Sequence, residues 1–371
     1  MKNTAGLSAP LRIAIDAMGG DFGPESTMPA VIGQARQHPE FEFVVYGHQQ
    51  QCQLDGNSTV NLAEQLPENI DFKHVDKQIE MADVPTYALR YGRDSSMAMA
   101  LKSLARGEVA ACITAGNTGA LVALSRHMLG ICPSIDKPAL CKIMPTHLGR
   151  SYMLDLGATI NCSSDQLVQF ARLGAALYKQ DNGNVHQLPS VRLLNIGSEH
   201  FKGMDVIRDA AESLGNMSSL DYQGYIEGDE IYRGVADIIV CDGFVGNIAL
   251  KSSEGVARFM LESLQGALSK STGLSTGLGT MRNTSVQKTA QLNGERDQDM
   301  PDTQTVNAVK QWQQACDPAR YNGAQLLGVN GLVVKSHGGV SGHAFSQALL
   351  MLVEQIKKQS SVPFDDLLNA I

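Results

Sequence analysis

One pattern recurs along this chain: a short apolar or β-branched run, a loop of glycine with Asp or Asn, and then a stretch of helical period. Such a run predicts a strand, and the small residues after it let the backbone turn directly into a helix. This order is typical of βαβ units with parallel strands. The three clearest examples pass from strand to loop within Arg12–Asp21, Val109–Gly119 and Ala236–Asn247.

The repeat predicts an α/β fold in which ligands bind at the carboxyl ends of the strands, where helix N-termini present free amides. Residues Pro24–Gln37 read as one of the helices, since a proline is tolerated in its first turn. Ser163 and Gln166 have the spacing of a capping box and predict the start of another. The length of 371 residues allows one large α/β unit or about two domains. We predict one large catalytic domain over residues 1–371.

A polar segment interrupts the pattern. Residues Ser269–Asp317 are rich in Ser, Thr, Gly, Asn and Gln and contain the single tryptophan, Trp312. We predict an insertion at about residues 265–320. It forms either a helical arm or lid, or a solvated excursion on the surface.

Charge and cysteine usage limit the class of partner. The net charge of -8, without a long Lys/Arg block, argues against nucleic acid as the main partner. The seven cysteines form no CxxC pair, which favours buried thiols in a reducing compartment. No stretch approaches about 18 unbroken apolar residues and no signal peptide is recognised, so we expect a cytoplasmic protein.

The first loop, Asp16–Asp21, is a candidate anion site. Gly19 and Gly20 would let backbone amides approach an anion, although they suit a tight structural turn equally well. Asp16 and Asp21 could hold a hydroxyl, a metal or a lysine, or cap the following helix. No metal-ligand pattern or dinucleotide fingerprint accompanies them, so we predict neither metal nor cofactor.

A second candidate combines two arginines with the start of a helix. Arg90 and Arg93 come just before Ser95 and Ser96, where a helix is predicted to begin. Guanidinium groups bind oxyanions bidentately, and a helix N-terminus adds amide donors and a favourable dipole. The pattern predicts phosphate recognition; capping by a serine beside solvated arginines is the alternative.

Two further loops carry Gly and Asn. In the first, Asn117 can donate to a carbonyl or phosphoryl oxygen, or the loop is an ordinary capped turn. In the second, Lys251 lies one helical turn after Asn247 and could neutralise phosphate or form a surface ion pair. The remaining candidates in these loops are Gly116, Thr118, Gly119, Asp242 and Gly243.

His337 follows an apolar strand in the run Lys335–Gly339. It could carry a proton, or hydrogen-bond within the fold. No GxSxG elbow follows an apolar strand, since the match at Gly273–Gly277 lies in the polar segment, and there is no Walker A or HExxH motif. A covalent nucleophile is therefore not indicated.

Taken together, these motifs resemble the bacterial phosphate:acyl carrier protein acyltransferases of phospholipid synthesis. The resemblance covers nearly the whole chain. It rests on the runs Ile13–Asp21, Asp94–Met97, Ala115–Leu121, Asp155–Ala158, Leu194–Gly197, Glu227–Gly228, Val240–Asn247, Leu326–Gly331 and Lys335–Gly338.

The resemblance implies a Rossmann-like three-layer αβα fold, akin to phosphotransacetylases and to isocitrate and isopropylmalate dehydrogenases. It implies a homodimer that moves a long-chain acyl group from acyl carrier protein to inorganic phosphate. The acyl phosphate would pass to a membrane glycerol-3-phosphate acyltransferase for phosphatidic acid synthesis. Peripheral association with the inner face of the membrane is an open alternative to a purely cytoplasmic location.

This chemistry gives the candidates roles. Direct attack by phosphate needs a cationic cradle, donors for the oxyanion and a proton for the leaving thiolate. We expect phosphate to be held by Arg90, Arg93 and Lys251 with Ser95, Ser96 and Thr118. Asn117, Asn247 or the loop amides beside them would face the oxyanion, and His337 could carry the proton.

An acidic carrier requires a local basic patch on an acidic enzyme. The candidates around the predicted arm are Arg258, Lys270, Arg282 and Lys288. Two rival functions remain: a phosphotransacetylase that uses acetyl coenzyme A, and a non-catalytic scaffold for acyl carrier protein.

Overall fold

The computed structural model describes residues 11–53, 66–183, 186–272, 312, 317–339, 341–359 and 364–371. Its contacts divide the chain into two compact units, residues 1–250 with 321–371 and residues 251–320. Most of the predicted insertion, including Arg282 and Lys288 and the side chain of Lys270, lies outside the described residues.

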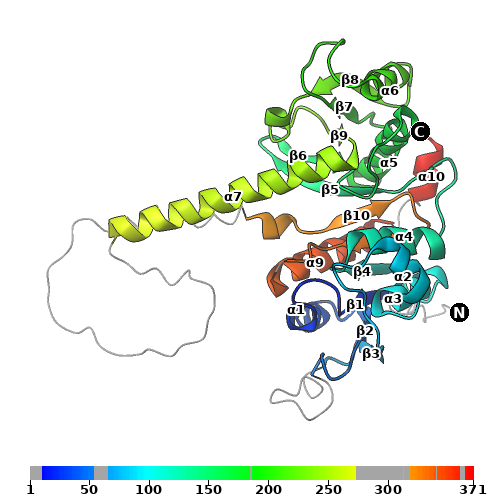
Figure 1. Ribbon diagram of the computed structural model, residues 1–371, viewed down its shortest axis with the longest axis vertical. Helices are drawn as coiled ribbons and strands as arrows, with labels where there is room; N and C mark the ends of the chain where they lie inside the picture. The colour runs from blue at the N-terminus through cyan, green and yellow to red at the C-terminus, as the bar shows by residue number, and fades with distance from the viewer. Residues whose placement is uncertain are drawn as a thin grey trace, which may run out of the picture. The chain divides into compact units, whose positions relative to one another are not determined.

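The larger unit contains a single mixed sheet (Figure 1). Its strand order is β3-β2-β1-β4-β11-β10-β5-β6-β9-β7-β8. The strands are β1 (Leu11–Asp16), β2 (Phe41–Gly47), β3 (Ile70–His74), β4 (Ala111–Thr114), β5 (Ala139–Thr146), β6 (Gly149–Leu154), β7 (Ser190–Leu194), β8 (Asp221–Ile226), β9 (Ile238–Val240), β10 (Ala324–Leu327) and β11 (Leu332–Lys335).

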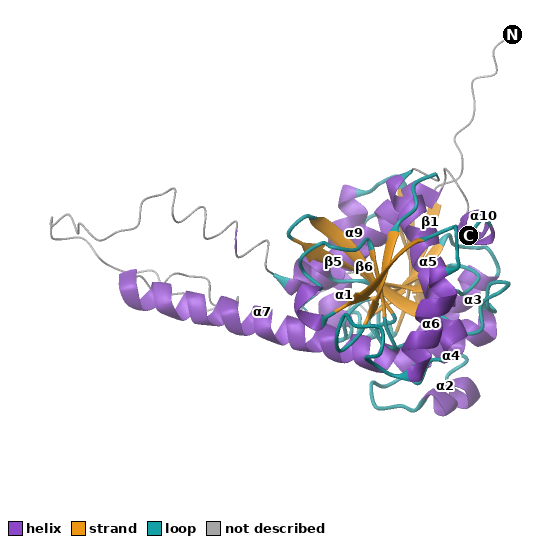
Figure 2. Ribbon diagram, turned by 90° about the horizontal axis from the view of Figure 1, so that it is seen from above, coloured by secondary structure: helices purple, strands orange, loops and turns teal. Residues whose placement is uncertain are grey.

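Helices cover both faces of this sheet, as Figure 2 shows for the elements around the strands. One face packs against α2, α3 and α4, and the other against α1, α9, α5, α6 and α10. The predicted three-layer α/β fold is therefore confirmed. The helices are α1 (Pro24–Gln37), α2 (Pro85–Tyr91), α3 (Ser96–Ala105), α4 (Thr118–Met128), α5 (Ser164–Asn182), α6 (Asp205–Gly215), α7 (Gly243–Thr272), α9 (Gly342–Gln359) and α10 (Phe364–Asn369).

Local sequence signals explain several helix boundaries. The predicted capping box is present, because the Ser163 hydroxyl accepts from the Gln166 amide while the Gln166 side chain accepts from the Ser163 amide. Gly183, in the left-handed conformation, ends the same helix. Helix α1 spans the predicted Pro24–Gln37, with its proline in the first turn.

The direction of the strands differs from the expectation. Strands β1, β4 and β11 are parallel, but β10 is antiparallel to both β11 and β5, and β5 is antiparallel to β6. Strand β9 is parallel to β6. The carboxyl ends of β6 and β9 therefore lie at the opposite edge of the sheet from those of β1, β4 and β11. The expectation that all three glycine loops share one edge is wrong.

The smaller unit is described along α7 from Lys251 to Thr272. Val256, Phe259 and Met260 are exposed there, at helical spacing. None of the described helices is long and apolar enough to cross a membrane. The six described cysteines are free and buried, as predicted.

Candidate functional site

Three loops meet at the carboxyl ends of β1, β4 and β11, and we call them the first loop cluster. The Thr114 hydroxyl donates to a carboxylate oxygen of Asp16 at 2.6 Å. The Ser336 amide donates to the carbonyl of Thr114 at 2.8 Å, and the Asp21 amide to that of Gly338 at 2.9 Å. Residues more than 200 positions apart in the chain are thus joined by backbone and buried side-chain hydrogen bonds.

Glycine is required where two of these loops touch. A Cβ added to Gly19 would lie 2.5 Å from the amide nitrogen of Gly116 and 2.9 Å from its Cα. Neither atom can move away without shifting the backbone. Gly20 has φ +94 and lies against the carbonyl of Gly338, so it also needs the conformational freedom of glycine.

Asp16 orders this cluster from inside. Its side chain is buried and accepts from Thr114, from the Met18 amide and from Ser96 at the start of α3. Burial raises the pKa of Asp16, while these hydrogen bonds and the charge of Lys335 favour its ionised form. Asp16 thus holds the loops together from beneath.

Lys335 is a site residue that the sequence reasoning missed. It is 8% exposed, at the last position of β11, and its Nζ donates to the carbonyl of Ala115 at 3.0 Å and to that of Ser336. A buried ammonium therefore lies under the Gly116 turn. A lysine that ends an otherwise apolar strand of Leu and Val was the signal that could have revealed it.

Asn117 has a different role from the one predicted. Its side-chain oxygen caps α4 by accepting from the Ala120 amide at 3.0 Å. Its side-chain NH2 donates to the carbonyls of Met81 at 2.9 Å and Asp83 at 2.8 Å. Both ends of this amide are therefore engaged within the fold, which leaves backbone amides as the candidate oxyanion donors. The amides of Thr118 and Gly119, at the start of α4, have no acceptor earlier in the helix.

The predicted cradle of two arginines and two serines does not form as one group. Ser95 is buried and caps α3, donating to the carbonyl of Gly92 at 2.6 Å, and Ser96 bonds to Asp16. Arg90 and Arg93 are exposed, and Arg93 donates through Nε to the carbonyl of Leu89 at 2.7 Å. The serines therefore serve the fold, while the arginines face outward.

His337 lies within the first loop cluster. Its amide donates to the side-chain oxygen of Asn322, and its Nδ1 accepts from the Gly339 amide at 3.1 Å. In the neutral ring this places the proton on Nε2. The imidazole can thus donate a hydrogen bond or a proton through Nε2.

A second loop cluster lies at the opposite edge of the sheet. There Asp155 is fully buried and accepts from four backbone amides, of which that of Thr159 is the shortest contact at 2.6 Å. Asp242 caps α7 by accepting from the Phe244 amide and also accepts from the Cys162 amide, both at 2.8 Å. A Cβ on Gly243 would lie 2.5 Å from an Asp155 oxygen.

The remaining predicted residues fall beside this second cluster or in the smaller unit. Asn247 lies next to Gly157. A Cβ added to Gly157 would lie 3.5 Å from the Cβ of Asn247. Lys251 belongs to the smaller unit, so its reach to phosphate stays a prediction. Of the residues predicted from sequence, the structure thus brings together Asp16, Gly19, Gly20, Asp21, Gly116, Thr118, Gly119 and His337, and separates them from Asp242, Gly243 and Asn247.

Among the described residues, His48, His74 and Asp76 come close enough to hold a metal ion, with one ligand atom of each within 4.8 Å of the others. However, His74 Nδ1 accepts from the Gln49 amide, and Nε2 lies 2.9 Å from the Asp76 carboxylate. Both ring nitrogens are therefore already used. The group is a hydrogen-bonded polar cluster, and we assign no metal to it.

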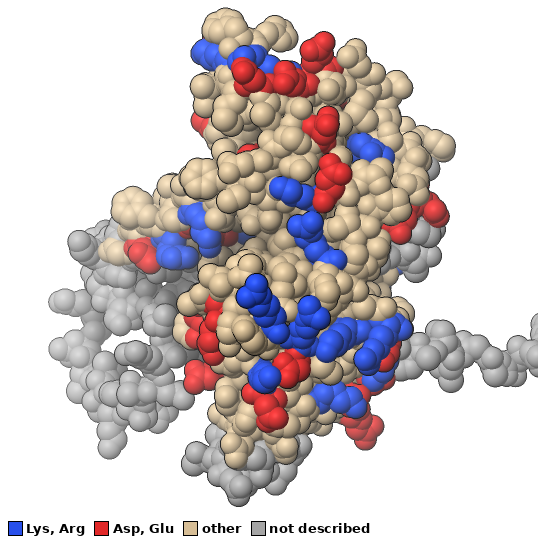
Figure 3. Space-filling view, turned by 45° about the vertical axis from the view of Figure 1, so that its right-hand side comes forward, with Lys and Arg blue, Asp and Glu red and all other residues tan. Residues whose placement is uncertain are grey.

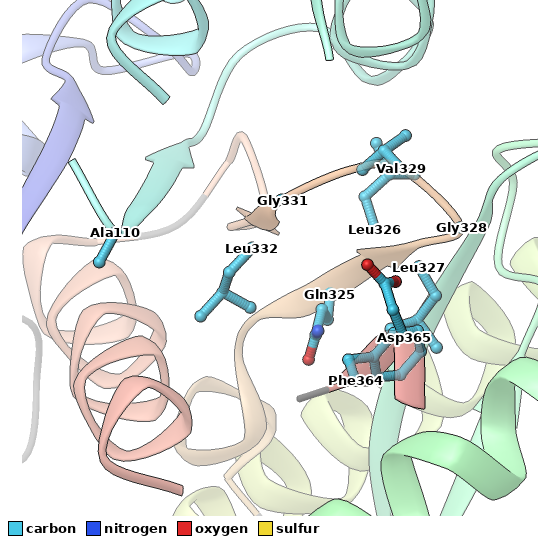
Figure 4. Close-up of a pocket in the computed structure, with 10 residues that line it drawn as sticks. All are labelled: Ala110, Gln325, Leu326, Leu327, Gly328, Val329, Gly331, Leu332, Phe364 and Asp365. Atoms are coloured by element: carbon cyan, nitrogen blue, oxygen red, sulfur yellow. The ribbon is translucent and has the colours of Figure 1, made fainter. Parts of the chain in front are cut away.

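A cavity of about 300 Å³ opens beside the β10–β11 connection (Figure 4). It is lined by Ala110, Phe364, Asp365 and seven residues between Gln325 and Leu332. Ala110 precedes β4 and Leu332 begins β11, so the cavity faces the amino ends of these strands. It is separate from the first loop cluster.

Comparison with known proteins defines the class. The fold is similar to a phosphotransacetylase from Streptococcus pyogenes (TM-score 0.55, 14% identity, 96% of each chain). It is also similar to the EutD phosphotransacetylase from Staphylococcus aureus (TM-score 0.52, 14% identity, 94% of each chain). These likenesses show the fold.

The family follows from closer matches. Residues 11–362 match the model of the family described as "Fatty acid synthesis protein". The chain is 41% identical to the phosphate acyltransferase of Aliivibrio salmonicida and 39% identical to that of Photobacterium profundum, over 97% of each chain. The chain belongs to this family of phosphate acyltransferases, and it is an enzyme.

The contact between Gly19 and Gly116 yields a mutational prediction. Gly19→Ala should lower acyl transfer at least about tenfold, because the added methyl must push the two loops apart. The control is Gly33→Ala on α1, where an added Cβ meets nothing within 4 Å. It should keep full activity and gain up to about 1 kcal/mol of stability. Full activity in Gly19→Ala would show that this contact is not needed.

Asp155 yields a pH prediction. Burial raises its pKa to about 6 despite the four amide donors. The unfolded chain ionises at lower pH, so the folded state binds the extra proton between about pH 4 and 6. The unfolding free energy of wild type minus that of Asp155→Asn should then fall as pH rises through this window, by about 3 kcal/mol. Urea titrations at several pH values measure it, and a rise with pH would contradict the assignment.

Proposed function

We propose that the enzyme moves a long-chain fatty acyl group from acyl carrier protein to inorganic phosphate, and that the acyl phosphate serves phosphatidic acid and phospholipid synthesis. The observation that carries this proposal is the first loop cluster. Its glycines bring backbone groups together at the start of α4, over a buried lysine. Such an arrangement of amides and positive charge suits phosphate and a developing oxyanion.

The chemistry needs no covalent enzyme intermediate. An oxygen of the phosphate dianion bonds to the thioester carbon, and the carbonyl electrons move onto its oxygen. Collapse breaks the C–S bond, and the electron pair leaves on sulfur. The thiol gains one proton and the hydrogen phosphate loses one, so atoms and charge balance.

Residues of the first loop cluster fit these steps. The amides of Thr118 and Gly119 are the proposed oxyanion donors, because α4 leaves them without intrahelical acceptors. Lys335 acts as a positioning residue that holds the Ala115 carbonyl and adds positive charge. His337 gives its Nε2 proton to the departing sulfur, and the proton of the hydrogen phosphate replaces it at Nε2, so the ring ends neutral as it began. Lys251 stays in the proposal as a phosphate-neutralising cation.

A homodimer is part of the proposal. Around the second loop cluster the side chains of Ile160, Phe244 and Ile248 are 58%, 61% and 50% exposed. Apolar side chains gathered in this way are typical of association surfaces. We also propose a cytoplasmic location, with peripheral membrane contact and delivery of the product to a membrane glycerol-3-phosphate acyltransferase.

One rival has an observation in its favour. The similar solved structures include phosphotransacetylases, which favours transfer between acetyl coenzyme A and phosphate. A sequence identity near 14% shows the fold only and does not identify the acyl donor. A scaffold that only presents acyl carrier protein would have no need of the buried Lys335 or of the ordered His337 tautomer.

Incubation of the purified protein with palmitoyl acyl carrier protein and labelled phosphate tests the proposal. Acyl phosphate, trapped as a hydroxamate, should form faster than with acetyl coenzyme A as donor. His337→Ala should lower kcat at least about tenfold, since proton transfer by a positioned group contributes that much or more. His200→Ala, an exposed histidine elsewhere, is the matched control. Preference for acetyl coenzyme A would establish the phosphotransacetylase function. Absence of product with both donors would leave the non-catalytic scaffold as the remaining function.

A further inference from the structure

Helix α2 and the segment just before it present apolar side chains to solvent. Met81, Val84, Tyr87 and Tyr91 are 42%, 60%, 47% and 62% exposed, and the rings of Tyr87 and Tyr91 lie 5.2 Å apart between centroids. With the exposed Arg90 and Arg93 they form what we call the α2 surface. Tyrosine, methionine and arginine are the residues enriched where proteins bind one another.

Two outward-facing arginines, Arg90 and Arg93, carry the positive charge of this surface. From Met81 to Asp94 the chain carries two cations, Arg90 and Arg93, and two carboxylates, Asp83 and Asp94. Asp94 is itself paired with Lys77 at 2.8 Å. Figure 3 shows Lys and Arg side chains gathered in a band across the lower half of this view. Among the described residues neither Arg90 nor Arg93 forms an ion pair with a carboxylate, so both guanidinium groups are available to an acidic partner.

The α2 surface adjoins the first loop cluster. The carbonyls of Met81 and Asp83 accept from the Asn117 side chain at the start of α4. A Cβ on Gly338 would lie 2.8 Å from the terminal methyl of Met81. A Cβ added to Gly119 would lie 2.9 Å from Cγ of Pro85, at the start of α2. A partner bound on α2 would therefore stand next to the groups assigned to the reaction.

We propose that the α2 surface is the docking site of the acyl carrier protein, which is acidic and must deliver its thioester into the first loop cluster. This inference rests on the proposed function. Arg90 and Arg93 then pair with carboxylates of the carrier instead of holding inorganic phosphate, and the tyrosine pair packs against its apolar side chains. Charge complementarity of this kind speeds association and makes it sensitive to salt.

Binding without turnover tests the surface directly. Fluorescently labelled carrier protein in its thiol form, which has no acyl group to transfer, is titrated with the full-length enzyme. Arg90→Glu and Tyr91→Ala should each weaken the affinity at least about tenfold, and added salt should weaken wild-type binding. Arg233→Glu, an exposed cation of the same unit, should bind as wild type does. Wild-type affinity in both α2 variants would overturn the proposal.

Three further readouts separate the alternatives. If Arg90→Glu raises the KM for phosphate and leaves carrier binding intact, the arginine holds phosphate and the proposal fails. If the variants lose only binding to anionic lipid vesicles, or only self-association by sedimentation, the surface belongs to a membrane or a second copy. A wild-type enzyme that binds the carrier on α2 but forms no acyl phosphate would refute the proposed function and leave the docking site standing.

Discussion

The close approach of Gly19 to Gly116 is the constraint on which the proposed site depends. Two loops that are almost 100 residues apart meet without any side chain between them. The contact is possible because buried Asp16 accepts hydrogen bonds from both loops' surroundings, through Thr114, Ser96 and the Met18 amide. Lys335 supplies the opposite charge beneath the loop that contains Gly116. Backbone amides, a helix N-terminus and a fixed cation are thereby held in one place before any ligand arrives.

The strand direction changes three times, between β11 and β10, between β10 and β5, and between β5 and β6, and this explains why one sequence pattern serves two different places. The loops after β6 and β9 use similar elements at the opposite edge of the sheet: glycines packed on a buried aspartate, and a side chain that caps a helix, here Asp242 where the first cluster has Asn117. Asp155 there accepts four amides, so its carboxylate is occupied by the fold. The homodimer that we propose would use the exposed apolar side chains beside it, and the chemistry that we propose belongs to the first loop cluster.

Local features could be predicted from the sequence and non-local ones could not. The capping box at Ser163 and the bounds of α1 depend on residues a few positions apart, and both were predicted correctly. The direction of β10 depends on pairing with β11 and β5, which no local pattern encodes. Asn117 was given an oxyanion role because its partners, the carbonyls of Met81 and Asp83, lie more than 30 residues away in sequence. Lys335 was missed for a similar reason, since only the folded chain shows the Ala115 carbonyl that it binds.

The central claim is that phosphate binds at the first loop cluster. Titration of the full-length protein with inorganic phosphate, followed through backbone amide chemical shifts, tests it most directly. The account predicts saturable shifts at Gly19, Gly116, Thr118 and Gly119, with Gly243 and Asn247 unaffected. Shifts confined to Gly243 and Asn247, or none at the first loop cluster, would contradict it.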